Sequence, residues 1–235
     1  MTNPQLSTAH LNGTPYRRET IEALRTRMQR ARDDEQFRDF EELKLSSKSE
    51  DYDIRCRLGQ KNILCAAWHG GEIERGSEKL AEAIAGDEFH YYAFIAHLKT
   101  ASLDSPHPFR ITSSRFNEPL LLSLAQKSDT VVGIHGCSTI KGSERIFVGG
   151  RDQKLTRSFI DHLRHHGYQA GADYVFPGTH PNNPCNRGVR PGIQIEVPQD
   201  YLQWLVELKN CGELDRLALT IRQFLRALPA SKWRE

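Results

Sequence analysis

Short apolar stretches alternate along this chain with amphipathic segments, and this alternation limits the possible fold more than any other feature. The expected strands are Tyr52–Leu58, Asn62–Ala67, His90–Ala96, Phe109–Thr112, Thr130–Ile134, Arg145–Val148 and Gly192–Val197. The expected helices are Phe37–Leu43, Gly76–Ile84, Asn117–Ala125, Asp152–His166, Gln199–Leu208 and Glu213–Leu228. Strands that take turns with helices are typical of a largely parallel sheet covered on both faces. The sequence therefore predicts an α/β fold.

The domain organisation follows from length and from where the apolar pattern begins. A chain of 235 residues is long enough for one good-sized domain with a substantial core. Residues 1–35 are polar and rich in arginine, with a candidate helix at Arg17–Glu35. We expect them to form an N-terminal arm, which either is solvated or docks to a partner or a polyanion. Residues 36–235 are expected to form the α/β domain. Within it, Ser77 and Asp152 are the predicted N-caps of two helices, and the Gly- and Pro-rich segment Gly167–Arg190 is expected to be a functional loop.

Composition excludes several classes of protein. Lysine and arginine total 32 against 30 acidic residues, so the net charge of +2 gives no indication of a nucleic-acid or membrane partner. Five widely spaced cysteines without a C-x-x-C pair favour free thiols in a reducing compartment. An apolar leader and any run of 18 apolar residues are both missing, which predicts a cytoplasmic protein, retained there or released when the cell lyses. The Gly-rich fingerprints of nucleotide-binding loops are missing too.

Histidines and acids stand where predicted strands end. His69 follows the stretch Asn62–Ala67, and His135 follows Thr130–Ile134. Ligands of open α/β sheets bind beyond the carboxyl ends of the strands, so these imidazoles are expected at one site. Two histidines and one carboxylate leave a tetrahedral zinc ion one open position for water. Glu72 and Glu74 both follow His69 closely enough to be the carboxylate, and the spacing alone leaves the choice between them open. Ordinary loop histidines are the alternative.

Five further residues are candidates for chemistry or substrate binding. Glu196 interrupts an apolar strand, where an unpaired carboxylate is costly, so it either faces a cleft for acid–base work or forms a structural ion pair. Asn186 and Arg187 lie in the long loop before that strand, and a guanidinium group is well suited to binding a carboxylate. Arg151 is a weaker candidate beside a predicted helix start. Cys137 could be proposed as a nucleophile, although the nearby His135 is better explained as a metal ligand.

A succession of motifs resembles one known family. The motifs are His69-Gly-Gly-x-Ile-Glu74, Ile111-Thr112-Ser113 followed by Phe116-Asn117-Glu118-Pro119, Ile134-His135-Gly136-Cys137, Val148-Gly149-Gly150-Arg151-Asp152, Pro181–Gly188 and Gly192–Glu196. Together they resemble the poly-γ-glutamate hydrolases of phages and bacteria over roughly Phe37 to Leu208. The chain departs from that family at Arg110, where the family often has a histidine.

The resemblance implies a compact relative of the zinc carboxypeptidases with a mixed sheet between helices. It implies one Zn2+ per chain, held by His69, Glu74 and His135, and it is the ground for preferring Glu74 over Glu72. It also implies that Glu196 is the general base and that Asn186 and Arg187 face the substrate. The expected activity is hydrolysis of γ-glutamyl amide bonds in an anionic polymer such as poly-γ-glutamate.

Two other functions remain open from the sequence. One is a zinc deacylase or carboxypeptidase for a small acylated amino acid, which would not shorten a polymer from within. The other is a non-enzymatic, replication-associated protein that binds nucleic acid through the basic arm. Such a protein would need no metal, and its affinity would fall steeply with salt.

Overall fold

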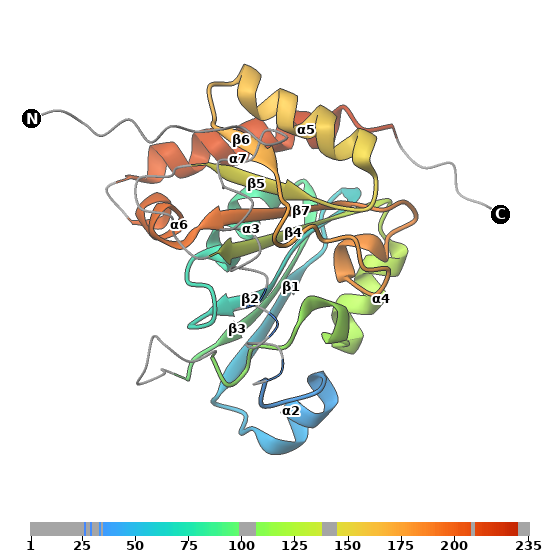
Figure 1. Cartoon of the computed structure of the whole chain (residues 1–235), viewed down its shortest axis with the longest axis vertical. Helices are drawn as coiled ribbons and strands as arrows, with labels where there is room; N and C mark the ends of the chain where they lie inside the picture. The colour runs from blue at the N-terminus through green and yellow to red at the C-terminus, as the bar shows by residue number, and fades with distance from the viewer. Residues whose placement is uncertain are drawn as a thin grey trace, which may run out of the picture.

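The computed structural model describes residues 35–98, 107–137, 145–207 and 210–229, together with Thr26, Gln29 and Asp33. Most of the predicted arm, residues 1–35, therefore lies outside the described residues. The described strands form one sheet in the order β1-β3-β2-β4-β7-β5-β6 (Figure 1). Their bounds are β1 Tyr52–Arg57, β2 Lys61–Gly71, β3 Phe89–Ala96, β4 Thr130–Cys137, β5 Ile146–Gly149, β6 Ala170–Ala172 and β7 Ile193–Pro198.

The sheet is mixed and mostly parallel. The pairs β3–β2, β2–β4, β4–β7 and β5–β6 are parallel, whereas β1–β3 and β5–β7 are antiparallel. The central strands β2 and β4 are buried along most or all of their length, which is usual for parallel strands covered on both faces. Burial on both faces explains why the sequences of these strands are continuous apolar runs. The predicted fold class, an α/β fold with a mixed, mostly parallel sheet between helices, is confirmed.

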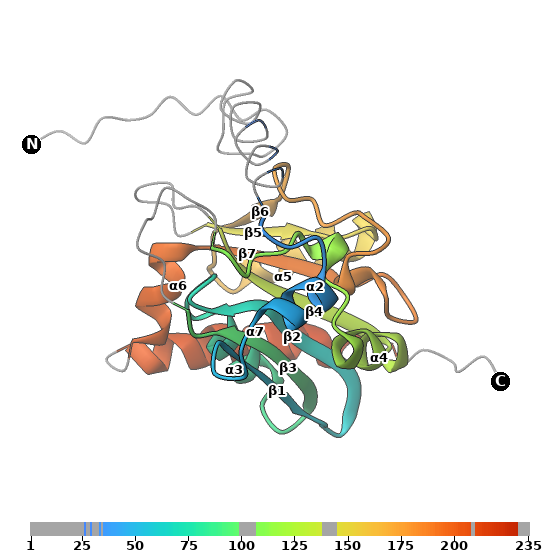
Figure 2. The ribbon, with the colours of Figure 1, turned by 90° about the horizontal axis from the view of Figure 1, so that it is seen from below.

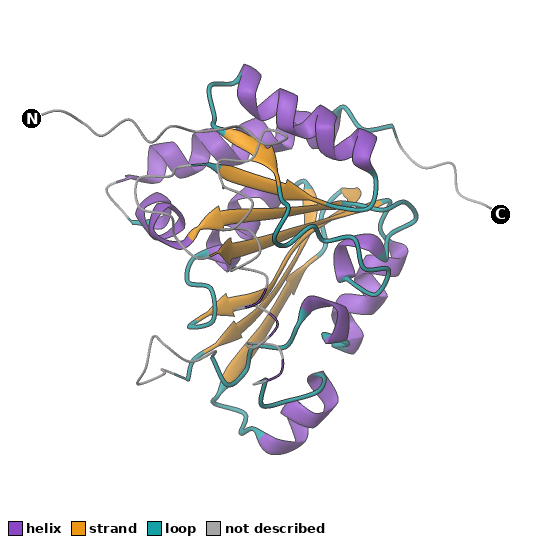
Figure 3. Cartoon of the chain, in the orientation of Figure 1, coloured by secondary structure: helices purple, strands orange, loops and turns teal. Residues whose placement is uncertain are grey.

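Helices cover the two faces of the sheet (Figure 3). The described helices are α2 Phe40–Ser46, α3 Ser77–Ala85, α4 Pro119–Lys127, α5 Gln153–His165, α6 Gln199–Val206 and α7 Cys211–Arg226. Buried residues of α3, α5, α6 and α7 pack in one core with one side of the strands. Those of α2 and α4 pack on the other side, together with buried side chains of the segment 109–116. Figure 2 looks at the molecule from below, with α2 in front of the strands. None of the described helices is both long and apolar enough to cross a membrane.

Local sequence explains where several helices begin. The carboxylate of Asp152 accepts hydrogen bonds from the backbone of Lys154 and Leu155, both at 3.0 Å, so the predicted N-cap of α5 is confirmed. The predicted cap at Ser77 is wrong. Ser77 is the first residue of α3, and the cap is Gly76 with φ of 96°, a conformation that glycine adopts without a steric penalty.

Two expectations about strands were wrong. Phe109–Thr112 forms no strand: Phe109 and Ile111 are buried against the α2 side of the sheet, so their alternation reflects the packing of an irregular segment. The short strand β6 was not expected, because it lies in the segment 167–190 that was predicted to be a loop. It consists of small residues and pairs with β5 alone. β2 and β4 also extend beyond their predicted ends, so His69 and His135 lie within the last residues of these strands.

Candidate metal centre

The candidate site lies where the neighbouring parallel strands β2 and β4 approach their carboxyl ends. His135 is on β4, and Glu74 is in the turn after β2, where its backbone amide donates to the carbonyl of His69 at 2.9 Å. The register of β2 against β3 shifts between Ala67 and Gly70. Irregularities of this kind redirect a side chain. The Nε2 atom of His69 contacts the backbone carbonyl of Ile111, a residue that packs in the same core as α2.

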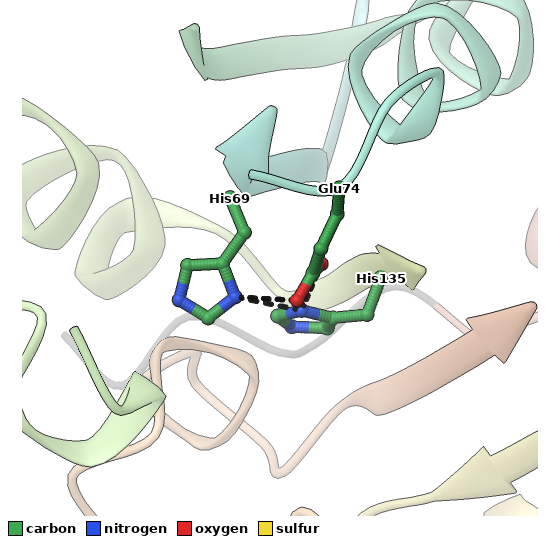
Figure 4. Close-up of side chains that lie close together, drawn as sticks. All are labelled: His69, Glu74 and His135. Carbon is green, nitrogen blue, oxygen red and sulfur yellow. Dashed lines mark hydrogen bonds and ion pairs between the residues drawn. The ribbon is translucent and has the colours of Figure 1, made fainter. Parts of the chain in front are cut away.

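Three side chains converge at this point (Figure 4). The Nδ1 atom of His69 lies 3.1 Å from Oε1 of Glu74 and 3.2 Å from Nδ1 of His135. Nδ1 of His135 lies 3.0 Å from Oε2 of Glu74. Each of these residues is only 2% exposed. One ligand atom from each lies within 4.8 Å of the others, so the structure brings together the three predicted metal ligands.

The tautomer of His69 shows why this cluster suits a cation. Its Nε2 atom contacts the carbonyl oxygen of Ile111 at 2.8 Å, and a carbonyl can only accept, so we assign the ring proton to Nε2. In the neutral ring, Nδ1 then directs a lone pair at the carboxylate of Glu74. Two acceptors at 3.1 Å are stable only with a proton or a metal ion between them. Two imidazoles and a carboxylate are ligands that zinc accepts, and an outer hydrogen bond such as the one to Ile111 is usual for a zinc-binding histidine.

The structure also separates the two acids that follow His69. Glu74 is buried in the cluster, and its Oε2 atom accepts a further hydrogen bond from the amide of Gly136 at 3.1 Å. The carboxylate of Glu72 instead forms an ion pair with Arg75, whose side chain is exposed. Of the two candidates left open by the spacing, Glu74 is therefore the one that faces both histidines.

Burial and neighbouring groups set the charges in the cluster. Burial alone would raise the pKa of Glu74, but the imidazoles of His69 and His135 outweigh it and lower this pKa well below its usual range. Burial lowers the pKa of His135, which favours the neutral imidazole. A charged carboxylate and a neutral imidazole are the forms that bind a metal ion.

Glu196 lies beside this cluster on the next strand. In the parallel register of β4 and β7 it is the partner of His135, so the two side chains are on the same face of the sheet. Gln194, two residues earlier on that face, donates to Oε1 of Glu196 at 2.9 Å. Burial and the negative charges of Glu74 and Asp173 raise the pKa of Glu196 well above its usual range. The raised pKa favours the uncharged carboxyl group over a carboxylate held in an ion pair.

A cavity of about 280 Å³ opens over these residues. Its lining comprises Glu35, His69, Arg110, Thr112, Ser113, Ser114, Phe176, Pro177, Gly178, Thr179, His180, Asn183, Gln194 and Glu196. The carboxylate of Glu35 fixes one wall, because it accepts from the backbone amide of Thr112 at 3.0 Å and from its hydroxyl at 2.7 Å and also contacts Arg115. The long loop before β7 contributes the lining residues between Phe176 and Asn183.

A buried tryptophan packs against the site. The Trp68 ring meets the His135 ring edge to face, with centroids 4.7 Å apart, and its Nε1 donates to the hydroxyl of Ser113 at 3.0 Å. Gly133 makes room for this ring, since a Cβ atom there would lie 2.3 Å from the indole. Trp68 thus links His135 to the wall of the cavity.

The predicted substrate-binding residues lie outside the cavity lining. The side-chain amide of Asn186 donates to the carbonyls of Gly178 and His180 at 2.6 and 3.0 Å, so it shapes the loop that forms the wall. Arg151 is exposed, and its backbone amide contacts Oδ1 of Asn186. Arg187 lines a second cavity of about 340 Å³, together with Arg38 and Arg115 among others. Ser114 lines both cavities, so the second adjoins the first.

Sequence reasoning missed three residues of the site. Arg110 was noted only as a departure from a family pattern, although it lines the cavity and its Nη2 atom lies 3.6 Å from Oε1 of Glu74. Ile111 orients His69 through a backbone carbonyl, which leaves no trace in side-chain patterns. Gln194 follows the alternation that would have identified it, because it is a polar residue two positions before Glu196 in the same apolar strand.

The alternative of a cysteine nucleophile gains no support. Burial and the nearby negative charges of Glu196, Asp173 and Glu74 raise the pKa of the Cys137 thiol well above its usual range. The thiolate is the nucleophilic form, and at neutral pH this environment suppresses it.

Comparison with known proteins identifies the family. Residues 37–216 match the model of the poly-gamma-glutamate hydrolase family. The chain belongs to this family. It is 30% identical over 164 residues to the UPF0714 protein YndL of Bacillus subtilis (strain 168), and 29% identical over 167 residues to the SPbeta prophage-derived UPF0714 protein YoqZ of the same organism. These alignments cover 68% and 69% of this chain, and they span only 62% and 58% of the two relatives.

Two solved structures share the fold. A zinc-free apo structure of YndL superposes with a TM-score of 0.71 and 26% identity, covering 83% of this chain and 98% of the other. A bacteriophage poly-gamma-glutamate hydrolase superposes with the same TM-score at 22% identity, covering 82% of this chain and 97% of the other. The second likeness concerns the fold alone.

Proposed function

We propose that this protein is a zinc-dependent hydrolase that cleaves γ-glutamyl amide bonds of poly-γ-glutamate or a related γ-linked polymer. The observation that carries the proposal is the buried convergence of His69, Glu74 and His135 next to Glu196, at the edge of a cavity. Family membership supports the γ-glutamyl substrate class, and the existence of a zinc-free form of the related YndL structure supports zinc as the metal.

In this proposal His69, Glu74 and His135 hold one zinc ion per chain. Zinc, when bound, would polarise the carbonyl of the scissile amide and lower the pKa of a water molecule. The chain's own contribution is rigidity. The carbonyl of Ile111 fixes the orientation of His69, the amide of Gly136 holds Glu74, and Trp68 packs against His135.

Glu196 is the proposed acid–base group. It would accept the proton of the attacking water and deliver it to the nitrogen of the leaving amine. A carboxyl group with a raised pKa is suited to both steps, because a weaker acid is a stronger proton acceptor and its protonated form can deliver the proton to the amine. Gln194 holds one carboxyl oxygen, and Asn183 in turn donates to Oε1 of Gln194 at 2.7 Å.

Asn186, Arg187 and Arg151 are the substrate-binding residues proposed from the sequence, and their places in the fold suggest distinct tasks. Arg187, in the adjoining second cavity, is placed to meet a carboxylate further along a polymer. Its Nε atom is buried and finds no partner among the described residues, which leaves a donor available for an anion. Asn186 would act by shaping the wall of the cavity. Arg151 would contribute only a long-range attraction to the anionic polymer.

Metal analysis combined with polymer hydrolysis tests the proposal. Protein purified without chelators should hold about one equivalent of zinc and should shorten poly-γ-glutamate from within, seen as falling chain length in size-exclusion chromatography. Alanine at His69, Glu74 or His135 should remove both the metal and the activity, because two remaining ligands bind zinc too weakly.

Glu72→Ala is the matched control, since Glu72 neighbours the same ligands in sequence but pairs with Arg75. It should retain the metal and the activity. Release of single residues without internal cleavage would favour a carboxypeptidase for small substrates instead. A wild-type protein that holds zinc but cleaves no γ-glutamyl bond would refute the proposed function.

A further inference from the structure

Arg110 supplies the positive charge of the catalytic cavity. Among the described residues that line the cavity, it is the only lysine or arginine. Its side chain is 31% exposed and lines the cavity, so an incoming group can reach it. Its backbone belongs to the irregular segment that also provides Ile111, the residue whose carbonyl orients His69. Arg110 is therefore fixed close to the reacting groups.

The guanidinium has donors left to bind an anion. It forms an ion pair with Oε1 of Glu74 at 3.6 Å, which is longer than a hydrogen bond, and no side-chain hydrogen bond of Arg110 exists within the described part of the chain. Glu74 is already engaged by His69, His135 and the amide of Gly136. Two carboxylates of the described residues line the cavity itself: Glu35 is engaged by Thr112 and Arg115, and Glu196 accepts a hydrogen bond from Gln194. A planar guanidinium in this setting is a two-pronged site for an incoming carboxylate.

The chemistry of a γ-linked glutamate chain places one carboxylate next to the scissile bond. The leaving nitrogen is bonded to the α-carbon of the next residue, and in a γ-linked chain that carbon carries a free carboxylate at every position. In an α-linked chain the same carbon carries a neutral amide, except at the C-terminal residue. A cation beside the reacting groups can therefore distinguish an internal γ-bond from an internal α-bond.

We propose that Arg110 binds the carboxylate on the carbon attached to the scissile nitrogen, and that this contact makes the enzyme selective for γ-linked chains. The inference rests on the proposed function and adds a specificity residue to it. Arg187 does not fill this role, because it lines the second cavity and not the one that contains His69 and Glu196.

Two dipeptides that differ only in this carboxylate test the inference. γ-Glutamyl-glutamate carries the group, and γ-glutamyl-4-aminobutyrate lacks it but is otherwise the same molecule. The zinc-loaded wild type should prefer the first by about 10- to 100-fold in kcat/KM, the range of a charge-assisted hydrogen-bonded pair. Arg110→Met should reduce this ratio to about one by slowing the first substrate only. Arg110→Lys, which keeps the charge but loses the fork, should retain part of the preference.

Arg75→Met is the matched control, because Arg75 is an exposed arginine beside Glu74 that does not line the cavity. It should keep the wild-type ratio, and both variants should hold zinc and melt as the wild type does. An Arg110→Met protein that slows both dipeptides equally would overturn the inference and indicate that Arg110 acts on the scissile carbonyl.

A binding measurement separates failure of the inference from failure of the proposed function. In zinc-loaded Glu196→Gln protein, calorimetry should show tighter binding of γ-glutamyl-glutamate than of γ-glutamyl-4-aminobutyrate, and the additional Arg110→Met change should abolish the difference. Equal binding of the two dipeptides when Arg110 is present would overturn the inference, whether or not the wild type is active. If the Glu196→Gln variant shows a clear binding preference but the wild type cleaves neither dipeptide, the proposed activity is overturned instead.

Discussion

Three buried carboxyl groups near the site have different proton affinities, because each has different neighbours. Glu74 faces two imidazoles, and its pKa is lowered. Glu196 has no such partners and lies near two other acids, so its pKa is raised. Burial raises the pKa of Asp173 to about 6, although two backbone amides partly oppose this effect. Carboxyl groups that lie near one another in one site can therefore differ in charge at the same pH.

Replacing Glu196 by glutamine tests its role directly. Glu196→Gln preserves the shape and the contact with Gln194 but removes the proton acceptor. We expect kcat to fall by about 10²- to 10⁴-fold, the range for loss of a positioned acid–base group, while zinc content and polymer binding are unchanged. Steady-state kinetics and metal analysis of the same preparation measure both. Near wild-type activity would rule out the role, and loss of zinc would make Glu196 a metal ligand.

Asp173 should make the stability of the protein depend on pH. Its pKa is raised from 3.8 to about 6 on folding, so the folded state binds the proton more tightly than the unfolded state. The free energy of unfolding should then fall as pH rises from about 4 to about 6. Asp173→Asn keeps the Oδ1 acceptor for Val175 and Phe176, and it should remove this decline, with a gain of up to about 3 kcal/mol at pH 7.

Urea unfolding at several pH values measures this effect. Asp161→Asn is the control, since Asp161 is a largely exposed acid in α5. An unchanged slope between pH 4 and 6 in Asp173→Asn would show that other groups cause the pH dependence.

The residue types of the site were predictable, but some of the contacts were not. Burying a histidine at the end of an apolar run, or an acid inside one, costs free energy unless the side chain has polar partners. His69, His135 and Glu196 could therefore be identified from the pattern. The choice between Glu72 and Glu74 depends on the course of a turn, so only the family resemblance favoured Glu74 at the level of sequence; in the structure Glu72 pairs with Arg75 instead. Arg110 was out of reach because an irregular segment, distant in sequence, brings it to the cavity.

At the scale of elements, periodicity was sufficient wherever side-chain packing determines the structure. The stripes of α5 and α7 and the apolar runs of β2, β4 and β7 indicated these elements, although β2 and β4 continue past the ends that were expected for them. Periodicity failed where backbone pairing or irregular packing determines whether a segment forms a strand. β6 contains only alanine and glycine, and it forms because the edge of β5 is available. Phe109–Thr112 has the alternation of a strand without a neighbouring strand to pair with.

The contact between Gly133 and Trp68 should be important for the packing of β4 against β2. A methyl group at Gly133 would overlap the indole and push on the ring that supports His135. We expect Gly133→Ala to lower the free energy of unfolding by about 1–3 kcal/mol, the usual cost of overpacking a core, and to weaken zinc binding. Chemical denaturation and zinc titration measure the two effects.

Gly212→Ala provides the contrast, because nothing lies within 4 Å of a Cβ atom there and the residue belongs to α7. It should leave stability unchanged or raise it by up to about 1 kcal/mol. Equal effects of the two substitutions would show that Trp68 shifts without cost.

At the scale of the whole molecule, the candidate centre joins segments that are distant in sequence. His69 and His135 are 66 residues apart, and Glu74 connects them across two strands. A metal ion bound there stabilises the folded chain, since the unfolded chain does not offer the three ligands together. At free zinc of 100 times the dissociation constant the gain is about 2.7 kcal/mol, or roughly 5–10 °C in Tm for a chain of this size.

Calorimetry before and after treatment with EDTA should show this drop in Tm, and added zinc should reverse it. His135→Ala should melt at the same temperature with and without the chelator. A chelator effect that persists in His135→Ala would place the stabilising metal elsewhere in the molecule.

Glu35 connects the beginning of the described domain to the wall of the cavity, and this has a practical consequence for shortening the chain. A chain cut to begin at residue 36 would lose the carboxylate that holds the amide and hydroxyl of Thr112 and contacts Arg115. The segment that Glu35 holds also contains Arg110 and Ile111. A deletion intended to remove only the polar N-terminal arm would therefore alter both the orientation of His69 and the position of the Arg110 guanidinium in the cavity. A shortened protein that is to report on the native site must therefore retain Glu35.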